Sequence, residues 1–203
     1  MKERQRPKQP HERSEGPAPQ STEFVTRKYQ IAELIKLTFA GHPWYEDLSD
    51  EDALSRVDEC ILKPGFGAFI VIEDDLPIAG LWYDTPSHDE LRAERGQEII
   101  DFIKEINSQH ELNAIIWARE SVVHPTYQGK GLASKLRQDF LNHVAKTSEG
   151  NTLVLTRMRD DNGPILSVAK KFGYERTGIR MPSSQKPDVS HEYWYKLVEA
   201  ESF

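Results

Sequence analysis

The chain has 203 residues, of which 37% are hydrophobic and 29% charged, and its formal net charge is −7. No apolar run approaches the roughly 20 residues that a membrane-spanning helix needs, and a single cysteine excludes an internal disulfide. These features favour a cytoplasmic protein without a membrane partner. An acidic chain repels phosphate backbones, so we do not expect nucleic acid as a partner.

The first 20 residues differ in composition from the rest of the chain. They are rich in Pro, Gln, Glu and Arg, lack apolar periodicity and carry a net charge of +2, which leaves −9 for residues 21–203. Because no apolar segment follows the basic start, it is not a secretory signal. We interpret residues 1–20 as a disordered tail and residues 21–203 as one domain.

Apolar periodicity predicts alternating helices and strands along this domain. In chain order we predict a strand at 23–29, helices at 30–40 and 49–62, strands at 67–75 and 77–85, a long helix at 88–107, a strand at 113–123, a helix from 132, a strand at 151–159, a helix at 163–174 and two final strands. The strand–helix–strand succession over 113–159 implies a parallel pair with a right-handed crossover, and the hairpin at 74–76 implies antiparallel strands. The predicted fold class is therefore α/β, a single-domain mixed sheet of six or seven strands flanked by helices.

The helix at 49–62 has a recognisable start and contains the single cysteine. Ser49 and Asp52 resemble a capping box at its first turn. Cys60 shares one helical face with Ala53 and Val57. We interpret Cys60 as core packing, with a reactive thiol as the alternative.

The sequence VVHPTYQGKGLASKL, which begins at Val122, leads from a strand into a helix through two glycines. The first turn of a helix leaves its N–H groups unpaired and carries the positive end of the helix dipole. Glycines remove side chains there, so an anionic group can approach closely. Residues Gly129, Lys130 and Gly131 are therefore a candidate phosphate cradle, and the alternative is a turn that needs positive φ.

Three features around this loop point to one family. The string Gln128-Gly129-Lys130-Gly131-Leu132-Ala133 fits the pattern Q/R-x-x-G-x-G/A. It resembles the acetyl-CoA pyrophosphate loop of the GNAT-type N-acetyltransferase superfamily. Val123-His124-Pro125 resembles the V-x-P before that loop, and Asn162 followed by Phe172-Gly173-Tyr174 resembles the second motif of the family. A Rossmann fingerprint would need glycine where Ser134 stands.

The resemblance covers about residues 22–198 and implies a GNAT-like acyl-CoA N-acyltransferase fold. It implies direct transfer of an acetyl group from acetyl-CoA to a primary amine of a small molecule or peptide. No metal is expected, and the chain would be a monomer or homodimer. The alternative is a non-catalytic acyl-CoA-binding regulatory domain.

The resemblance also assigns residues to the donor site. A bulge in the strand 113–123 would free backbone groups at Val122 and Val123 to pair with the pantetheine arm. The pyrophosphate would lie against Gln128, Gly129, Lys130, Gly131, Leu132, Ala133 and Ser134. Asn162 would face the pantetheine arm, and it is equally suited to cap the next helix. Lys130 and Lys135 either add charge near the 3′-phosphate or are solvated.

Glu120 is the candidate general base, because many relatives carry an acidic residue three positions before the residue matched by Val123. Strand alternation would place Ala118, Glu120 and Val122 on one face. The alternative for Glu120 is a salt bridge to Arg119 or Arg157.

The sequence departs from the family at the position of the general acid. Ala169 stands where many relatives have a tyrosine that protonates the leaving thiolate. The alternatives for the general acid are Ser167, Tyr195 and water, and this departure keeps the non-catalytic alternative open.

Aromatic residues lie near the segments that shape the acceptor pocket in this family. They suit a small amine with apolar parts or an ammonium group held by cation–π contact, and the alternative is core packing. These residues are Trp44, Tyr45, Trp82, Tyr83, Trp117, Tyr193 and Trp194. Asp84 and Asp89 could attract a cation or be solvated, and the helix at 88–107 could cover the site.

Overall fold

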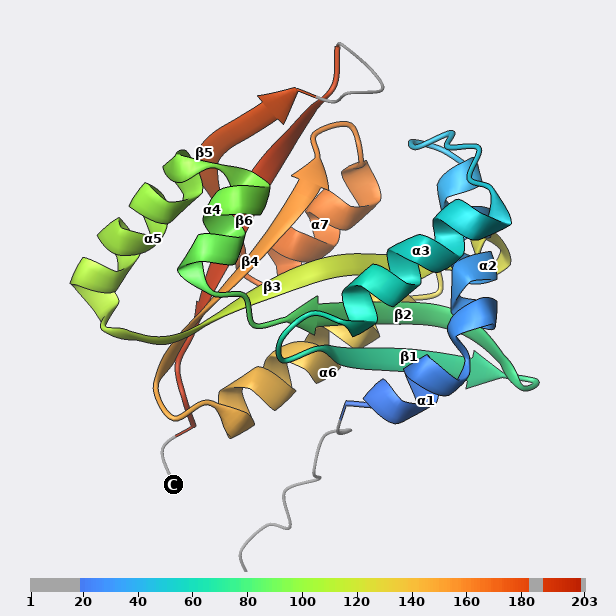
Figure 1. Ribbon diagram of the computed structural model, residues 1–203, viewed down its shortest axis with the longest axis horizontal. Helices are drawn as coiled ribbons and strands as arrows, with labels where there is room; N and C mark the ends of the chain where they lie inside the picture. Colours follow the sequence, from blue (N-terminus) through green and yellow to red (C-terminus); the bar gives the residue numbers. More distant parts are fainter. Residues whose placement is uncertain (1–18, 183–187, 202–203) are drawn as a thin grey trace, which may run out of the picture.

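The structure is a computed structural model, and it describes residues 19–182 and 188–201. Its helices and strands alternate as shown in Figure 1. The helices are α1 (Ser21–Thr26), α2 (Lys28–Ala40), α3 (Asp50–Ile61), α4 (His88–Arg95), α5 (Gln97–His110), α6 (Leu132–Thr147) and α7 (Gly163–Lys171). The strands are β1 (Gly67–Glu73), β2 (Leu76–Asp84), β3 (Leu112–Val123), β4 (Asn151–Arg159), β5 (Glu175–Pro182) and β6 (Ser190–Val198).

The strands form one mixed six-stranded sheet in the order β1-β2-β3-β4-β6-β5. The pair β3–β4 is parallel, as the strand–helix–strand succession predicted, and the other neighbours are antiparallel. Helices α1 to α5 lie on one face of the sheet, and α6 and α7 lie on the other (Figure 1). The predicted mixed α/β fold class is confirmed.

Each face buries its own apolar side chains. Leu136, Phe140 and Val144 of α6 pack against the sheet from one side, as their spacing predicted. On the other side one core lies under α1 to α3 and a second lies under α4 and α5.

The predicted strand at 23–29 is wrong, because this segment contains α1 and the start of α2. Phe24 is fully buried and makes edge contacts with the rings of Phe66 and Trp82, both at 5.2 Å between centroids. Burial of this aromatic ring on a helix outweighs the strand propensity of the segment.

The predicted tail falls mostly on residues 1–18, which lie outside the described residues. Gln20, however, belongs to the fold. Its amide donates to the carbonyl of Ala68 at 2.6 Å, and its side chain accepts from the amide of Ile70 at 3.0 Å. Gln20 therefore lies on the edge of β1, although the predicted domain begins at residue 21.

The predicted long helix at 88–107 is two helices, and this correction has a local cause. Gly96 ends α4 and precedes α5 with a φ of 88°, a conformation that favours glycine. A complete capping box of Ser87 and Glu90 opens α4. Both helices pack on β3, β4 and β6, so α4 can reach the sheet with side chains of its own.

The interpretation of α3 is confirmed. Ser49 accepts from the amide of Asp52 at 3.1 Å, as the capping pattern predicted. Cys60 packs against the core under α1 to α3. Burial raises the pKa of its thiol to about 11, so the thiol stays protonated at neutral pH and has a packing role.

Candidate functional site

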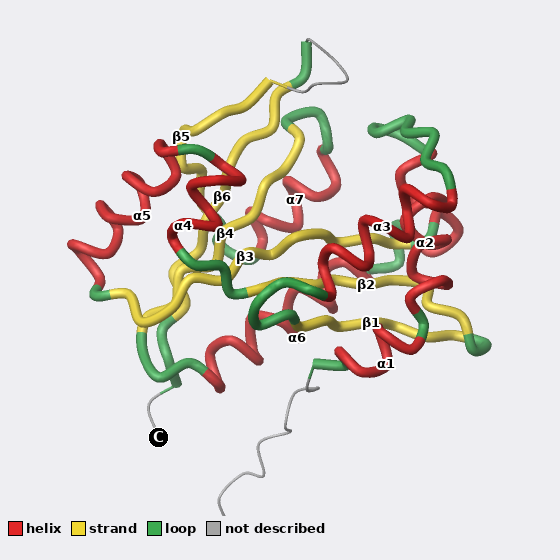
Figure 2. The backbone as a smooth tube through the Cα atoms, in the orientation of Figure 1, coloured by secondary structure: helices red, strands yellow, loops and turns green. Residues whose placement is uncertain are grey.

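The sheet opens between its two central strands. The parallel pairing of β3 and β4 ends at Ala118 and Thr156, where the Thr156 hydroxyl donates to the Ala118 carbonyl at 3.0 Å. Beyond this point β3 continues to Val123 beside β2, and β4 continues to Arg159 beside β6. Figure 2 shows the two halves of the sheet diverging. The ends of both strands therefore face a gap that no strand fills.

A bulge in β3 lies at the start of this gap, as the resemblance implied. Trp82 of β2 pairs with Glu120 and Tyr83 pairs with Ala118, so Arg119 is the extra residue. Ala118 packs beneath α6, whereas Glu120 and Val122 turn toward α1 to α3. The predicted alternation, with Ala118 on the face of Glu120, is wrong because a bulge shifts the side-chain alternation by one residue.

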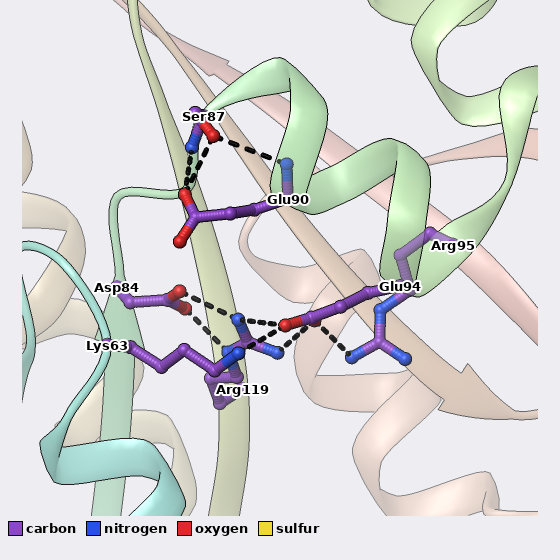
Figure 3. A network of polar contacts seen from close by, with 7 residues as sticks. All are labelled: Lys63, Asp84, Ser87, Glu90, Glu94, Arg95 and Arg119. Atoms are coloured by element: carbon purple, nitrogen blue, oxygen red, sulfur yellow. Dashed lines mark hydrogen bonds and ion pairs between the residues drawn. The ribbon is translucent and has the colours of Figure 1, made fainter.

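Arg119 is held by a buried network of charges, drawn in Figure 3. Its guanidinium makes two hydrogen bonds to Asp84, at 2.6 and 2.7 Å, and one to Glu94 of α4 at 2.6 Å. Lys63, which follows α3, also contacts Glu94. Burial raises the pKa of Glu94, but the hydrogen bonds from Arg119 and Lys63 outweigh burial and lower this pKa to about 2. The network fixes the bulge to β2, α4 and the end of α3.

Glu120 has a different partner from the two that the sequence suggested. Its Oε1 lies 3.1 Å from Nε of Arg56 on α3, and Arg56 also contacts Glu46 at 3.3 Å. Its Oε2 is buried without a hydrogen-bond partner among the described residues. Burial raises the pKa of Glu120, and Arg56 opposes that shift. Glu120 is thus a partly satisfied carboxylate whose affinity for a proton is increased.

A small cavity of about 130 Å³ lies at Glu120, where the strands diverge. Its lining comes from α2 and α3 on one side and from β3, β4, α6, α7 and β6 on the others. The lining residues are Phe39, Trp44, Arg56, Arg119, Glu120, Ser121, Arg137, Thr156, Arg157, Met158, Arg159, Asn162, Ile165 and His191.

A larger groove of about 760 Å³ adjoins this cavity. It runs from the loop after α2, past the end of β3 and the glycine loop, to the first turns of α6 and α7. The two hollows share four lining residues, which are Trp44, Ser121, Asn162 and Ile165. A molecule that fills the groove therefore reaches the cavity that Glu120 lines.

The glycine loop has a backbone that requires glycine, and it also borders open space. Gly129 and Gly131 have φ values of 75° and 85°, so the turn does require glycine. A Cβ atom at either position would meet nothing within 4 Å, so both glycines border open space. Gly131 caps α6 without a side-chain hydrogen bond, and the first turn of α6 holds no acidic residue. The N–H groups of this turn are thus accessible to an anion.

The end of β3 turns backbone groups toward the groove. The amide of His124 donates to the carbonyl of Ile78 on β2 at 2.8 Å, so the amide and carbonyl of Val123 point away from β2. The Val123 carbonyl accepts from the side chains of Gln128 at 3.2 Å and Thr38 at 3.4 Å. Val123 therefore presents strand-like backbone beside the glycine loop.

Most of the residues assigned to the donor site line the groove together. They are Val123, Gln128, Gly129, Gly131, Leu132, Ala133, Ser134 and Asn162. Val122 does not line it, because its side chain is fully buried under α1 to α3. Lys130 also lies outside the lining, with Nζ 4.5 Å from the centre of the Tyr127 ring. Lys135 pairs with Asp139 on the surface of α6 at 2.7 Å.

Asn162 caps the next helix, which is one of the two roles suggested for it. Its Oδ1 accepts from the amide of Ile165 at 3.4 Å, which caps α7, and the residue lines both hollows.

The two residues suggested as substitutes for a general acid lie outside both hollows. Ser167 is exposed on α7, and the Tyr195 hydroxyl donates to Glu175 at 2.9 Å. Neither residue lines the groove or the cavity.

Of the aromatic residues suggested for the acceptor pocket, Trp44 alone lines it. Five are buried in the cores, which are Trp82, Tyr83, Trp117, Tyr193 and Trp194. Tyr45 is exposed, Asp84 is buried against Arg119, and Asp89 pairs with Arg92. The helix predicted at 88–107 was expected to cover the site. No residue of α4 or α5 is among the described residues that line either hollow.

The sequence did not point to Arg56, Arg159 or His191 as cavity residues. One signal was present in LVLTRMR, where alternate residues of β4 change from leucine at 153 and 155 to arginine at 157 and 159. This change from apolar to charged on one face marks where the strand leaves the core under α5.

Comparison with known proteins supports the fold. No family model and no curated protein matches the chain. A protein from Desulfovibrio desulfuricans assigned to the GNAT family of acetyltransferases has a TM-score of 0.55 at 13% identity, over 84% of this chain and 92% of its own. An aminoglycoside 6′-N-acetyltransferase complexed with coenzyme A has 0.58 at 13%, over 88% and 94%. The ribosomal-protein-S18-alanine N-acetyltransferase from Escherichia coli has 0.56 at 12%, over 92% and 94%. The chain therefore has a GNAT-type fold.

None of the helices in the described part of the chain is both long and apolar enough to cross a membrane.

Proposed function

We propose that the chain is an N-acetyltransferase that moves an acetyl group from acetyl-CoA directly to a primary amine of a small molecule or peptide. The observation that carries this proposal is the continuity of the two hollows. An open groove at an uncapped helix N-terminus leads to a small cavity that holds a buried carboxylate, Glu120. The similar aminoglycoside acetyltransferase was solved with coenzyme A, which agrees with this assignment of the groove.

The groove has the groups that an acyl-CoA donor requires. The two open glycines and the first-turn N–H groups of α6 suit the pyrophosphate, because backbone donors and the helix dipole both favour anions. Val123 offers extended backbone to the amides of the pantetheine arm, and Asn162 borders the same path. A donor bound in this direction would have its thioester end near Ser121 and Asn162, where the groove joins the cavity.

Glu120 would accept the proton that the acceptor must lose. An amine is protonated in neutral water and attacks only after it loses a proton, which a carboxylate can take directly or through a water. Burial raises the pKa of Glu120, which makes it a stronger base than an exposed carboxylate. Its Oε2 lacks a partner among the described residues and is thus available for this proton.

The transfer balances without a metal or redox partner. One ammonium proton passes to Glu120, the amine nitrogen forms a bond to the thioester carbonyl carbon, and the C–S bond breaks. A second proton from the nitrogen reaches the leaving sulfur through solvent, so the products are an amide and the free thiol of coenzyme A. Ala169 supplies no acidic group for this second step, since its side chain is a buried methyl group.

The second candidate is a domain that binds acyl-CoA without catalysis, and Ala169 is the observation that favours it. One screen separates the two. Acetyl-CoA is incubated with the protein and a panel of amines, free thiol is followed over time, and products are identified by mass. We expect thiol release that depends on the amine and yields an N-acetylated product. Donor binding without release from any amine would support the non-catalytic candidate.

A further inference from the structure

The small cavity is unusually basic for this chain. Five of its lining residues are arginines, at positions 56, 119, 137, 157 and 159, and one is acidic, Glu120. The whole chain has a net charge of −7, so composition does not explain this concentration. Two of these arginines lie at the end of β4, where Arg157 and Arg159 share one face of the strand. Arg157 and Arg159 thus lie on the β4 side of the cavity, whereas on the β3 side the Glu120 carboxylate is paired with Arg56 through Oε1.

Arg159 has one hydrogen-bonding group that is not satisfied. Its side chain is fully buried, and Nε and Nη2 contact Asp161 at 2.9 and 2.6 Å. Its guanidinium carbon lies 4.8 Å from the centre of the Trp44 ring. Nη1 is buried and has no hydrogen-bond partner among the described residues. A buried charged donor without a partner is costly, so a ligand that supplied an acceptor here would be stabilised.

Glu120 is the counterpart of Arg159 across the same cavity. Its Oε2 is also buried without a partner in the described part of the chain. Two unsatisfied atoms of opposite charge, one acceptor and one donor, therefore belong to residues that line a single hollow. A ligand with an ammonium group and an anionic group would satisfy both, whereas a ligand with cationic groups alone would satisfy only Glu120.

The surroundings of Arg159 favour an anion. The Trp44 ring stacks on the His191 ring, with centroids 6.2 Å apart and 24° between the planes. Burial and then the charges of Arg157 and Arg159 lower the pKa of His191 to about 4, so this imidazole is neutral at physiological pH. A neutral imidazole can donate a hydrogen bond to a carboxylate. Asp161, which pairs with two nitrogens of Arg159, does not line the cavity, and Glu120 is the one acidic residue among the described lining residues.

We propose that the acceptor is an amine that also bears a carboxylate, the amino-acid class, with its ammonium group at Glu120 and its carboxylate at Nη1 of Arg159. This inference rests on the proposed function and names the substrate class of the same site. The cavity of about 130 Å³ is close in size to an engineered cavity of roughly 150 Å³ that holds one benzene molecule. It suits a compact head group, and any longer side chain would extend into the adjoining groove or solvent.

The test compares matched ligands on the wild-type protein. A panel of amino acids is measured beside the amines that lack the carboxylate and beside the methyl esters. Transfer is followed by thiol release from acetyl-CoA, and binding is followed by calorimetry with coenzyme A present. We expect at least one amino acid to bind and react roughly 10-fold to 100-fold better than its two neutralised partners, the usual effect of a charge-assisted hydrogen bond.

The outcomes distinguish the two proposals. Transfer to amines without preference for the carboxylate would overturn this inference and leave the proposed function in place. Preferential binding of amino acids without thiol release would support the assignment of the cavity and contradict transfer. A panel in which no amino acid binds better than its ester would overturn the inference whatever the rates are.

A pair of variants locates the carboxylate. In Arg159→Gln the preference for the amino acid over its ester should fall roughly 10-fold or more. Arg176→Gln is the matched control, since Arg176 also lies over a tryptophan, Trp194 at 5.1 Å, and pairs with an acid, Glu192, outside the cavity. An unchanged preference in folded Arg159→Gln would contradict the assignment. If circular dichroism shows that this variant is unfolded, the wild-type ligand comparison decides.

Discussion

Replacing Glu120 by glutamine is expected to lower kcat by roughly 10²-fold to 10⁴-fold, the usual contribution of a general base. Glu120→Gln keeps the shape of the side chain and removes its ability to accept a proton. The donor groove does not include Glu120, so the affinity for acetyl-CoA should stay near the wild-type value. Initial rates of thiol release with a reactive amine, together with calorimetry for the donor, measure both quantities.

The pH dependence of the rate follows from the pKa shift of this carboxyl group. Burial raises the pKa of Glu120, so the ionised form that accepts a proton is lost as the pH falls through that raised value. The wild-type rate should therefore decrease on the acid side, and Glu120→Gln should lack this decrease. The difference between the two proteins should shrink at high pH, because more of the amine is then already deprotonated.

Glu46→Gln is the matched control for this experiment. Glu46 also contacts Arg56 but does not line the cavity, so its loss weakens the same ion pair without removing the proposed base. The control should retain most of the wild-type rate. Equal losses in both variants would mean that the rate depends on the position of Arg56 rather than on proton transfer to Glu120.

Stability separates a catalytic Glu120 from a structural one. A carboxyl group whose pKa is raised by folding binds more protons in the folded state than in the unfolded state. The free energy of unfolding therefore decreases as the pH rises from the unfolded pKa, about 4.3, to the folded pKa. Glu120→Gln removes this cost at neutral pH. A catalytic role therefore predicts a reduced rate without a reduced Tm, and a lower Tm with an unchanged rate would contradict it.

Gly131→Glu should weaken coenzyme A binding at least 10-fold while the fold survives. The added carboxylate would lie at the N-terminus of α6, where the pyrophosphate is proposed to bind, and like charges repel. An added Cβ meets nothing within 4 Å, so the change causes no clash, but the φ of 85° is strained for any other residue. Calorimetry with coenzyme A gives the affinity, and circular dichroism reports the fold.

Two controls separate charge from strain and location. Gly131→Gln has the same strain and size without the charge, so it should bind coenzyme A more tightly than Gly131→Glu. Gly178→Glu adds the same charge at another open glycine, with a φ of 82°, on β5 and outside the groove. It should leave the affinity unchanged. Equal affinities for Gly131→Glu and wild type would exclude the loop as the pyrophosphate site.

Apart from the break between α4 and α5 at Gly96, the order of the elements from β1 onward could be predicted, because local patterns determine it. The hairpin turn at Asp74 and Asp75, both with positive φ, and the capping of α3 by Ser49 are short-range features. The glycine loop is equally local, since its conformation depends on Gly129 and Gly131 themselves. The strand predicted at residues 23–29 was wrong for a non-local reason. The burial of Phe24 depends on distant residues of α3 and the sheet.

The contacts of Glu120 and the lining of the small cavity could be predicted less completely than the glycine loop. The bulge at Arg119 changes which face each later residue of β3 occupies, and its register depends on pairing with β2. The partner of Glu120 comes from α3, far from it in the chain, and no spacing rule connects Glu120 with Arg56. The cavity exists because β3 and β4 diverge, so Arg159 and His191 meet Glu120 only through tertiary structure.

The most direct test of the donor site compares coenzyme A with pantetheine by calorimetry on the wild-type protein. Both ligands offer the same thiol arm to Val123 and Asn162, but only coenzyme A has the pyrophosphate that the glycine loop and the N-terminus of α6 would hold. The account predicts that coenzyme A binds at least 10-fold more tightly, because charge-assisted hydrogen bonds to the pyrophosphate are lost in pantetheine. Equal affinities would contradict the assignment of the loop and, with it, the orientation that brings the thioester to Glu120.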